Sequence, residues 1–351
     1  MSALEPGVAL AFSRFSDAKA PRGGPIGSGH INDTYGVYVG SDEFVLQRVN
    51  PTVFPYAETQ MENIRRILEH LEKKSPDPRS RLALIKTREG TAFWKEDSGA
   101  VWRCYGGQTG TETVDAIDSP ERAHQAATAF GRFQRLLVDL PAPPLVETIP
   151  GFHDTPARVR AFETACRNAP ESRRKEAEDA IAFAHSNLRL AGLVPENLPT
   201  RVCHYDTKVN NVLFDRQSQN AVCVVDLDTA MPGHLPIDFG DLVRSAASEA
   251  PEDCKDLERV VARPVVIEAL AAGFLEEVGT VLTGEERASL PDAPAEIAFE
   301  LGIRFLTDFL DGDVYFKTHR PSQNLDRARV QFKLAEAFVR ERPLLARFCK
   351  V

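Results

Sequence analysis

The sequence predicts an α+β fold with two lobes, a small β-rich N-terminal lobe with one helix (residues 1–106) and a larger helical lobe (residues 107–351). Three observations predict this class. Alternating apolar and polar residues follow glycine-rich turns in the first third of the chain, and apolar residues at helical spacing dominate after residue 119. A single polar hairpin interrupts the helical part at residues 202–228.

The composition is that of an ordinary globular protein, with 43% hydrophobic and 26% charged residues. The net charge of −9 argues against a general nucleic-acid binder, which usually carries a basic face. None of the six cysteines forms a C-x-x-C pair, and no signal peptide or apolar run long enough to span a bilayer is visible. We expect a cytoplasmic protein without a nucleic-acid or membrane partner, either a monomer or a homodimer.

The elements of the β-rich lobe follow in order. Residues 8–15 predict a short helix, and residues 22–50 predict a glycine-rich turn followed by two strands joined by the tight turn "GSD". Residues 57–73 place Met61, Ile64 and Leu71 on one helical face. Residues 81–105 then predict three further short strands. Together these elements form a mostly antiparallel sheet with one inserted helix.

The helical lobe begins at Ser119, a good N-cap, with Pro120 in the first helical position. This helix extends to about residue 138, and another covers roughly 172–192 with Gly192 as its predicted end. After the polar hairpin, the chain from about residue 238 is predicted to be helical. Breaks are expected near Pro251, Pro264 and Gly284.

The polar hairpin consists of "HYDTKVNNVLFD" (residues 204–215) and "AVCVVDLD" (residues 221–228). If the second strand persists through residue 228, Asp226 and Asp228 point to the same side, because positions two apart share a face. With Asn211 they would form a set of hard oxygen ligands of the kind that Mg²⁺ takes together with phosphates. Asp206 would then remain to accept a proton from a substrate hydroxyl. The simpler alternative is turn chemistry, since Asp and Asn are common in turns.

The pattern H-x-D-x-x-x-x-N followed by V-V-D-L-D resembles the catalytic and metal-binding loops of protein-kinase-like phosphotransferases. The wider pattern "HYDTKVNNVLFD…VVDLDTAMPG…DFGDL" is similar to the aminoglycoside phosphotransferase and choline kinase branch. Within that branch, the chain resembles the N-acetylhexosamine 1-kinases from residue 29 to residue 331, in blocks such as "GHINDTY", "RFLTDFLDGDVYFK" and "NLDRARVQ". The resemblance implies a bilobal protein-kinase-like fold.

The resemblance also implies roles for single residues. Asp206 matches the catalytic base, Asn211 and Asp226 match the magnesium ligands, and Asp228 is a further ligand candidate. His204 matches a structural position that supports the catalytic loop. The implied activity transfers phosphate from ATP, with Mg²⁺, to the anomeric hydroxyl of an N-acetylhexosamine. Adenine is expected to bind the backbone near residues 102–106.

The expected nucleotide contacts come from the β-rich lobe. Arg48 stands where most relatives have a phosphate-anchoring lysine, and Glu62 is expected to pair with it, with Glu58 as a second candidate. A simpler alternative pairs Glu62 with Arg65 or Arg66 on the same helix. The residues of the glycine-rich loop expected to bind nucleotide are Gly27, Gly29 and Asn32.

The expected sugar contacts are Asp33, Arg304 and Tyr315, although an ordinary contact between helices would also explain the last two. Asp238 is expected to hydrogen-bond the catalytic loop, and Arg244 to join a structural ion pair. Three alternatives remain. The first is a kinase of this fold with another acceptor (an aminoglycoside, choline, homoserine or another sugar), the second is a catalytically inactive binding module, and the third is a metal hydrolase that uses His204 and Asp206 directly.

Overall fold

The computed structural model describes residues 2–26 and 32–350, so the predicted nucleotide contacts Gly27 and Gly29 lie outside the described residues. The chain forms two compact units. The first contains the chain up to Thr113, Leu136–Ile149 and Val212–Pro232, and the second contains Val114–Arg135, Pro150–Asn211 and the chain from Gly233. The chain therefore passes from one unit to the other several times, whereas the predicted division after residue 106 cuts it once.

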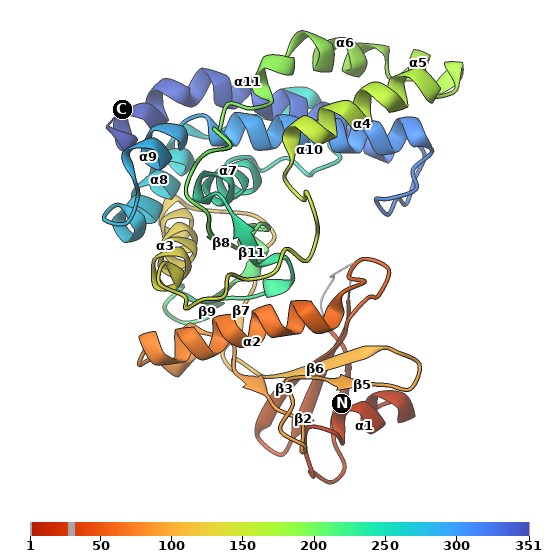
Figure 1. The fold of residues 1–351 in the computed structure, drawn as a ribbon, viewed down its shortest axis with the longest axis vertical. Coiled ribbons are helices and arrows are strands. Elements are labelled where there is room, and N and C mark those ends of the chain that lie inside the picture. Colours follow the sequence, from red (N-terminus) through yellow and green to blue (C-terminus); the bar gives the residue numbers. More distant parts are fainter. Residues whose placement is uncertain (1, 27–31, 351) are drawn as a thin grey trace. The chain divides into compact units, whose positions relative to one another are not determined.

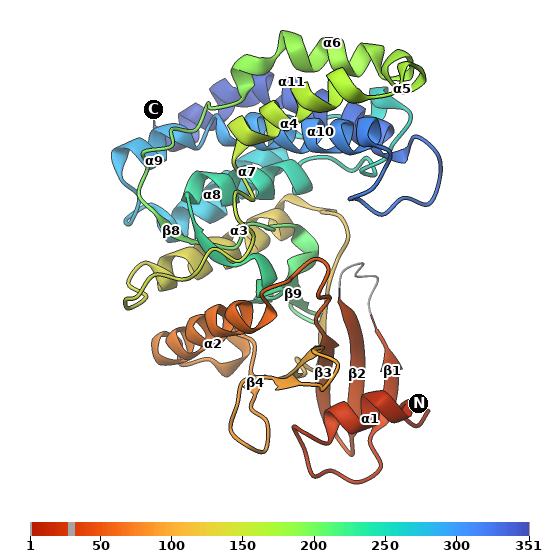
Figure 2. The same cartoon turned by 45° about the vertical axis from the view of Figure 1, so that its right-hand side comes forward.

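The first unit contains an antiparallel sheet, in which Figure 2 shows β1, β2 and β3 side by side. The strand order is β1-β2-β3-β6-β4, and β5 also pairs with β6. The strands are β1 (Arg22–Pro25), β2 (Asp33–Val39), β3 (Asp42–Arg48), β4 (Leu84–Ile85), β5 (Trp94–Lys95) and β6 (Val101–Gly106). The predicted hairpin and the three further strands of the β-rich part are confirmed.

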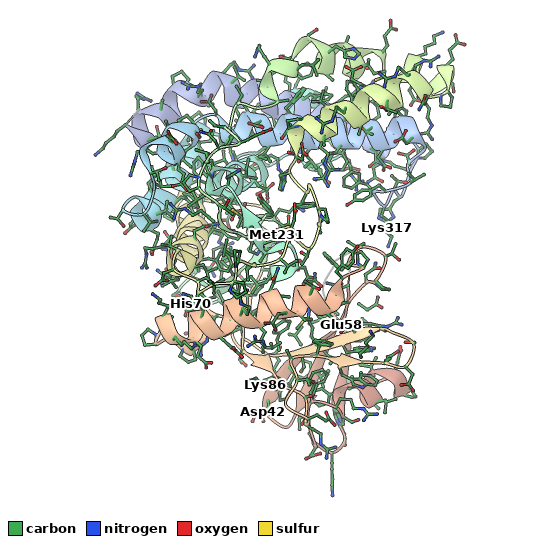
Figure 3. All side chains as sticks on the ribbon, in the orientation of Figure 1. Asp42, Glu58, His70, Lys86, Met231 and Lys317 are labelled. Carbon is green, nitrogen blue, oxygen red and sulfur yellow. The ribbon has the colours of Figure 1, made fainter. Side chains whose placement is uncertain are left out.

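The two faces of this sheet pack against different helices, α1 (Pro6–Phe12) and α2 (Ala57–Lys74) (Figure 1). Leu46 and Trp102 belong to the apolar cluster that includes Phe12 of α1. Gln47 alternates with Leu46 along β3, so it lies on the opposite face, where its cross-strand partner Arg103 reaches α2. Both helices were predicted, and Figure 3 labels Glu58 and His70 near the two ends of α2.

The strands of the polar hairpin, from Val212 onward, also belong to the first unit, in a smaller antiparallel sheet of order β10-β9-β7. Its strands are β7 (Thr111–Glu112), β9 (Val212–Asp215) and β10 (Ala221–Val224). The prediction that the second strand persists through residue 228 is wrong. Asp226 adopts the left-handed conformation (φ 58°, ψ 62°), and the 3₁₀ turn η4 (Leu227–Thr229) follows. Strand alternation therefore does not place the two carboxylates on one face.

The second unit is largely helical, and its longest helices α10 and α11 lie side by side (Figure 1). The α-helices are α3 (Pro120–Leu137, whose last two residues belong to the first unit), α4 (Thr155–Asn168), α5 (Glu171–Glu176), α6 (Glu178–Ser186), α7 (Leu235–Ala246), α8 (Pro264–Val278), α9 (Gly284–Ser289), α10 (Ala293–Asp311) and α11 (Gln323–Cys349). The remaining elements of the second unit are β8 (Arg201–Cys203) and the 3₁₀ turns η2 (Leu188–Leu190), η3 (Val209–Asn211) and η5 (Leu257–Arg259). The 3₁₀ turn η1 (Pro78–Ser80) belongs to the first unit, and β11 (Met231–Gly233) has its first two residues there.

One predicted helix is interrupted and another helix was missed. The segment 172–192 is divided at Ala177, whose backbone (φ −100°, ψ 13°) leaves the helical region between α5 and α6. The missed helix α4 has a recognisable start: the Asp154 side chain accepts a hydrogen bond from the backbone N–H of Ala157, and Pro156 occupies the first turn. That start signal was visible in the sequence.

Two further features concern membrane-spanning helices and the cysteines. Within residues 2–26 and 32–350, no helix has the length and apolar character needed to cross a membrane. All six cysteines are free thiols, and five of them are buried. Burial raises the pKa of Cys104 and of Cys223 to about 12 in each case. These thiols therefore behave as small core residues.

Candidate active site

The catalytic loop of the second unit runs from His204 to Asn211, between β8 and the start of β9. One carboxylate of α7, that of Asp238, accepts hydrogen bonds from the first residues of this loop. The backbone N–H groups of His204 and Tyr205 donate to Asp238 at 2.7 and 2.8 Å. Asp238 is fully buried, and burial raises its pKa despite these donors. The prediction that Asp238 hydrogen-bonds the catalytic loop is confirmed.

A second carboxylate of α7 supports the middle of the loop. Asp241 accepts from the backbone N–H of Thr207 at 2.9 Å. On its other oxygen, Asp241 pairs with Arg244 at 2.7 Å, which confirms the predicted structural ion pair. Because both partners of that pair are buried, its removal would leave an uncompensated charge beside the loop.

His204 and Tyr205 set the direction of the loop just before Asp206. The His204 ring lies edge-on to Phe130 and Phe133, and its Nδ1 accepts from the Asp206 backbone N–H at 3.3 Å. The structural role predicted for His204 is confirmed. Tyr205 has a left-handed backbone (φ 64°), and its ring covers Gly233 so closely that a Cβ there would lie 1.9 Å from the phenol oxygen.

The structure brings Asp206 and Asn211 together. The Asn211 side-chain amide donates to the Asp206 carboxylate Oδ2 at 3.1 Å and to its backbone carbonyl at 2.8 Å. Lys208, which the sequence analysis did not single out, lies 3.0 Å from the other carboxylate oxygen. Burial raises the pKa of Asp206, but the charge and hydrogen bond of Lys208, together with the charges of His204 and Arg244, outweigh burial, so the net pKa is lowered. Asp206 is therefore an ionised carboxylate fixed at both oxygens.

The donor chemistry of this region fits a magnesium ion. Asn211 is buried and turns its Nδ2 toward Asp206, so its Oδ1 is the amide atom that can face a cation, whereas Asn210 is exposed. Asn211 directly precedes β9, and the exposed Asp226 follows the partner strand β10 by two residues. No group of three or more His, Cys, Asp or Glu suited to a metal exists in the described part of the chain. Magnesium needs only one or two such ligands when phosphates complete its shell.

Asp228 lies in a different environment from Asp226. Its side chain is buried and forms an ion pair with Arg103 of β6, and Asn32 donates to its Oδ2 at 2.5 Å. Asn32 in turn accepts from the backbone N–H of Asn50 at 3.0 Å. The structure therefore places two of the predicted site residues, Asn32 and Asp228, in direct contact within the first unit.

The expected ion pair between Arg48 and Glu62 is not formed. Arg48 lies 3.9 Å from Asp33, its neighbour across the β2–β3 pair, and its side chain is 45% exposed. Glu62 is bound to Arg65 at 2.6 Å, one turn along α2, and Glu58 pairs with Lys95. Glu62 pairs with Arg65 and not with Arg48 because strand alternation puts Arg48 on the sheet face opposite α2. The simpler alternative for Glu62 was the correct one.

The first unit has a cavity of about 340 Å³ beside β3 and the small sheet. Val45 of β3 and Leu213 of β9 provide its apolar walls. Its size is within the range of small-molecule sites. The full lining consists of Glu43, Val45, Gln108, Gly110, Thr111, Leu213 and Arg216. Gln108 follows the end of β6 by two residues, close in the chain to the segment predicted to bind adenine.

In the second unit, Arg304 is the centre of an arginine–aromatic cluster, which we define as Phe152, His153, Tyr205, Glu300, Arg304 and Phe316. The Arg304 side chain is 11% exposed, and its guanidinium lies over the rings of Phe152 and Phe316 at 5.0 and 5.7 Å. The Glu300 carboxylate is 3.8 Å away. Tyr315, the next predicted sugar contact, is 65% exposed and packs edge-on to Phe316.

Glu300 connects this cluster to the catalytic loop. It accepts hydrogen bonds from His153 Nδ1 at 2.9 Å and from the Thr155 hydroxyl at 2.7 Å. The His153 ring contacts the ring of Tyr205, which immediately precedes Asp206. Burial raises the pKa of Glu300, but His153 and Arg304 outweigh burial, so the net pKa is lowered. The cluster is thus a buried charged network that ends one residue from the predicted base.

The fold and the catalytic loop define a small-molecule phosphotransferase of the protein-kinase-like class. The model of the phosphotransferase enzyme family (APH) matches residues 23–291, well over half of the chain, and the chain belongs to this family. It is therefore a kinase-type enzyme, as the sequence predicted, and the alternatives of a binding module and a metal hydrolase are set aside.

Solved structures share the fold. A microcompartment-associated aminopropanol kinase has a TM-score of 0.62 at 18% identity, covering 97% of this chain and 99% of its own. An amicoumacin kinase, solved with AMP-PNP and Ca²⁺, has a TM-score of 0.62 at 12% identity, covering 95% and 94%. The Plasmodium vivax ethanolamine kinase has a TM-score of 0.55 at 14% identity, covering 92% and 85%. At these identities the likeness establishes the fold, and the predicted α+β protein-kinase-like class is confirmed.

Proposed function

We propose that this enzyme transfers the terminal phosphate of ATP to the anomeric hydroxyl of an N-acetylhexosamine. The observation that carries the proposal is the arginine–aromatic cluster, because it presents a guanidinium between aromatic faces one residue from the predicted base. Guanidinium donors suit hydroxyl and acetamido oxygens, and an aromatic ring suits the flat face of a sugar. The sequence blocks shared with N-acetylhexosamine 1-kinases include this segment.

The charge of the cluster argues against a cationic acceptor. Arg158 donates to the backbone carbonyls of Gly151 and Phe152, next to the cluster. Burial and the neighbouring charge of Arg304 lower the pKa of Arg158, which shows that the two cations act on each other. An ammonium group placed here would add a further positive charge, and like charges in one site repel. A neutral sugar would not.

For the nucleotide, we propose that adenine occupies the cavity between Val45 and Leu213. Gly27, Gly29, Asn32 and Arg48 remain the proposed contacts for the phosphates, and Asp33 remains a proposed contact for the sugar. Glu62 has no proposed contact with the nucleotide, since its carboxylate is held by Arg65.

Asn211 and Asp226 are the proposed magnesium ligands, on the basis of their oxygen donors and their places at the two ends of the β9–β10 hairpin. The bound ion would neutralise charge on the phosphates. The described geometry makes Asp228 the weaker candidate of the three, because its carboxylate already accepts from Arg103 and Asn32.

In the proposed reaction, Asp206 accepts a hydrogen bond from the anomeric hydroxyl and orients its oxygen toward the terminal phosphorus. The bond between that phosphorus and the bridging oxygen of ADP breaks as the bond to the sugar oxygen forms, and the sugar proton passes to Asp206. The low pKa of Asp206 makes it a weak base, so its main contribution is orientation. Positioning and charge neutralisation supply most of the rate acceleration in phosphoryl transfer.

The test is an acceptor panel analysed by NMR of the products. N-acetylglucosamine and N-acetylgalactosamine are compared with free hexoses, an aminoglycoside, choline, ethanolamine and 1-amino-2-propanol. A phosphate-coupled anomeric carbon in an N-acetylhexosamine product supports the proposal. Similarity to amino-alcohol kinases favours a second candidate, an amino-alcohol kinase, and turnover of only cationic acceptors would establish it instead.

Two variants and one control test the roles assigned to Asp206 and Asn211. We expect Asp206→Asn to reduce kcat by about 10³-fold or more, with unchanged folding, since it removes the proton acceptor and its charge. Asn211→Ala should also lose activity and weaken the response to Mg²⁺. The matched control is Asn210→Ala, an exposed neighbour without an assigned role. Activity of Asp206→Asn within tenfold of the parent would contradict its assignment.

A further inference from the structure

Arg103 is a buried arginine that the sequence analysis did not single out. Its side chain is 1% exposed, on the face of the sheet that α2 covers, and its Nη1 approaches the sulfur of Met61 at 3.9 Å. Its Nε donates to the side-chain amide oxygen Oε1 of Gln47 at 2.9 Å, and the Gln47 Nε2 donates onward to the Thr34 hydroxyl at 3.1 Å. These contacts form one cross-strand row, Thr34–Gln47–Arg103, in the register of β2, β3 and β6.

The charge of Arg103 is balanced by Asp228. The Nη1 of Arg103 donates to Asp228 Oδ1, and the Asp228 side chain is only 4% exposed. A guanidinium this deeply buried needs a fixed counter-charge, because an unpaired buried charge is costly. The guanidinium also lies over the Tyr105 ring at 5.5 Å. With its side chain 1% exposed, Arg103 is placed to act on Asp228 rather than on a nucleotide in solution.

Both carboxylate oxygens of Asp228 are committed within the first unit. Oδ1 accepts from Arg103, and Oδ2 accepts from the Asn32 amide at 2.5 Å. The backbone around Asp228 is held as well, since the Gln60 amide donates to the Asp228 carbonyl at 3.0 Å. A metal ion at Asp228 would have to compete with a guanidinium and an amide for a buried carboxylate. This carboxylate therefore behaves as an anchor for the turn.

The residue that needs such an anchor is Asp226. It adopts a left-handed backbone conformation (φ 58°, ψ 62°), which is strained for a residue with a side chain. Conformations of this kind persist only when the surroundings fix them. The turn of Leu227–Thr229 directly follows, with Asp228 at its centre. The contacts of Asp228 therefore fix the turn that directly follows Asp226.

We propose that Arg103 and Asp228 form a fixed ion pair that positions Asp226, so that Asp228 anchors the turn and does not bind magnesium. This inference rests on the proposed function only in taking Asp226 as the magnesium ligand. The pair also accounts for the place of Arg48 in β3. The cation on the α2 side of the sheet is Arg103 of β6, whereas Arg48 of β3 lies on the other face. Arg103 is a positioning residue, since its buried guanidinium acts through Asp228.

The test separates anchoring from metal binding in two measurements that need no sugar acceptor. The first is the melting temperature of the metal-free, nucleotide-free protein. We expect Asp228→Asn to lower it by about 5 °C or more, because a buried pair is broken, and Asp226→Asn to change it little. The second is calorimetric binding of ATP at varied Mg²⁺ concentration. We expect Asp226→Asn to weaken the magnesium dependence at least tenfold and Asp228→Asn to change it less than threefold.

A double-mutant cycle keeps the proposal testable if a single variant fails to fold. Arg103→Met leaves Asp228 unpaired, whereas Arg103→Met with Asp228→Asn removes both charges and should recover much of the lost stability. Arg103→Lys keeps the charge and should be milder than Arg103→Met. Arg88→Met is the matched control, because Arg88 pairs with Asp17 at the surface with a 56% exposed side chain.

The possible results are distinct. A metal-free Asp228→Asn protein that melts like the parent but needs tenfold more Mg²⁺ would overturn the proposal and make Asp228 a ligand. Additive losses in the double mutant would also overturn it, since they would show that the two residues are not coupled. If no N-acetylhexosamine is phosphorylated, the proposed acceptor fails, but both measurements still decide the role of the Arg103–Asp228 pair.

Discussion

Replacing Asp308 by Asn is expected to loosen the loop that carries Tyr315. Asp308 is buried near the end of α10, and the backbone N–H groups of the next turn converge on its carboxylate. Val314 and Tyr315 donate to Oδ1 at 2.9 and 2.7 Å, and Phe316 and the Asn324 amide donate to Oδ2 at 2.9 and 2.8 Å. The four donors saturate one carboxylate, so the loop conformation depends on its charge and its two acceptor oxygens.

The expected loss of unfolding free energy in the Asp308→Asn protein follows from the number of hydrogen bonds that the substitution removes. An Asn side chain keeps one acceptor oxygen and places an NH₂ group against two of the donors. Hydrogen bonds to a charged partner contribute about 1.5–3 kcal/mol each. Losing two of them would cost about 3–6 kcal/mol, and access of the freed N–H groups to water reduces this to about 2–4 kcal/mol. The free energy of unfolding should fall by that amount.

The assay combines urea denaturation with steady-state kinetics on the acceptor identified by the panel. Since Phe316 packs on Arg304, we expect the KM for the acceptor to rise about tenfold while the KM for ATP stays unchanged. The matched control is Asp311→Asn, three residues along the same helix, exposed in the described structure. Equal stability and equal acceptor KM in the Asp308→Asn and Asp311→Asn proteins would refute the role assigned to Asp308.

Two further predictions test the catalytic ion pair and the helical packing. Lys208→Met should reduce kcat and move the acidic limb of the pH–rate profile to higher pH, because Lys208 lowers the pKa of Asp206 and its loss lets that pKa rise. Lys208→Arg is the conservative comparison. An acidic limb that stays at the same pH in Lys208→Met would exclude this electrostatic role. Gly273→Ala should lower the free energy of unfolding by about 1–3 kcal/mol, since a Cβ at this position would lie 2.4 Å from the His124 carbonyl oxygen. The control is Gly284→Ala, which has open space around it and should be nearly neutral in the same denaturation experiment.

Local signals in the sequence predicted the parts of the fold that depend on neighbouring residues. The apolar spacing of α2 and the turn chemistry of the β2–β3 hairpin each determine one element within about twenty residues. The contact between Asp206 and Asn211 was predictable for the same reason, because a five-residue offset within one loop limits how far apart they can lie. Asp238 of α7 was also predicted to hydrogen-bond this loop, whereas the support from Asp241 was not predicted.

The features that the sequence did not predict depend on contacts between distant segments or on a single backbone angle. Arg103 and Asp228 are 125 residues apart, and nothing in either local sequence links them. One left-handed residue, Asp226, ended the alternation that was expected to align the carboxylates. For Glu62, the near partner Arg65 prevailed over the distant Arg48, because a neighbour on the same helix is always within reach.

The contact between Tyr205 and Gly233 limits the order in which this enzyme can change during evolution. The phenol ring of Tyr205 occupies the space where any side chain at position 233 would begin. A substitution of Gly233 is therefore harmful while Tyr205 is present, and acceptable only after a smaller residue has replaced the tyrosine. Loss of Tyr205 would in turn remove ring contacts to Phe152 and His153 beside Arg304. The two positions should therefore change as a pair, and under the acceptor role proposed for the arginine–aromatic cluster that change would alter the acceptor preference.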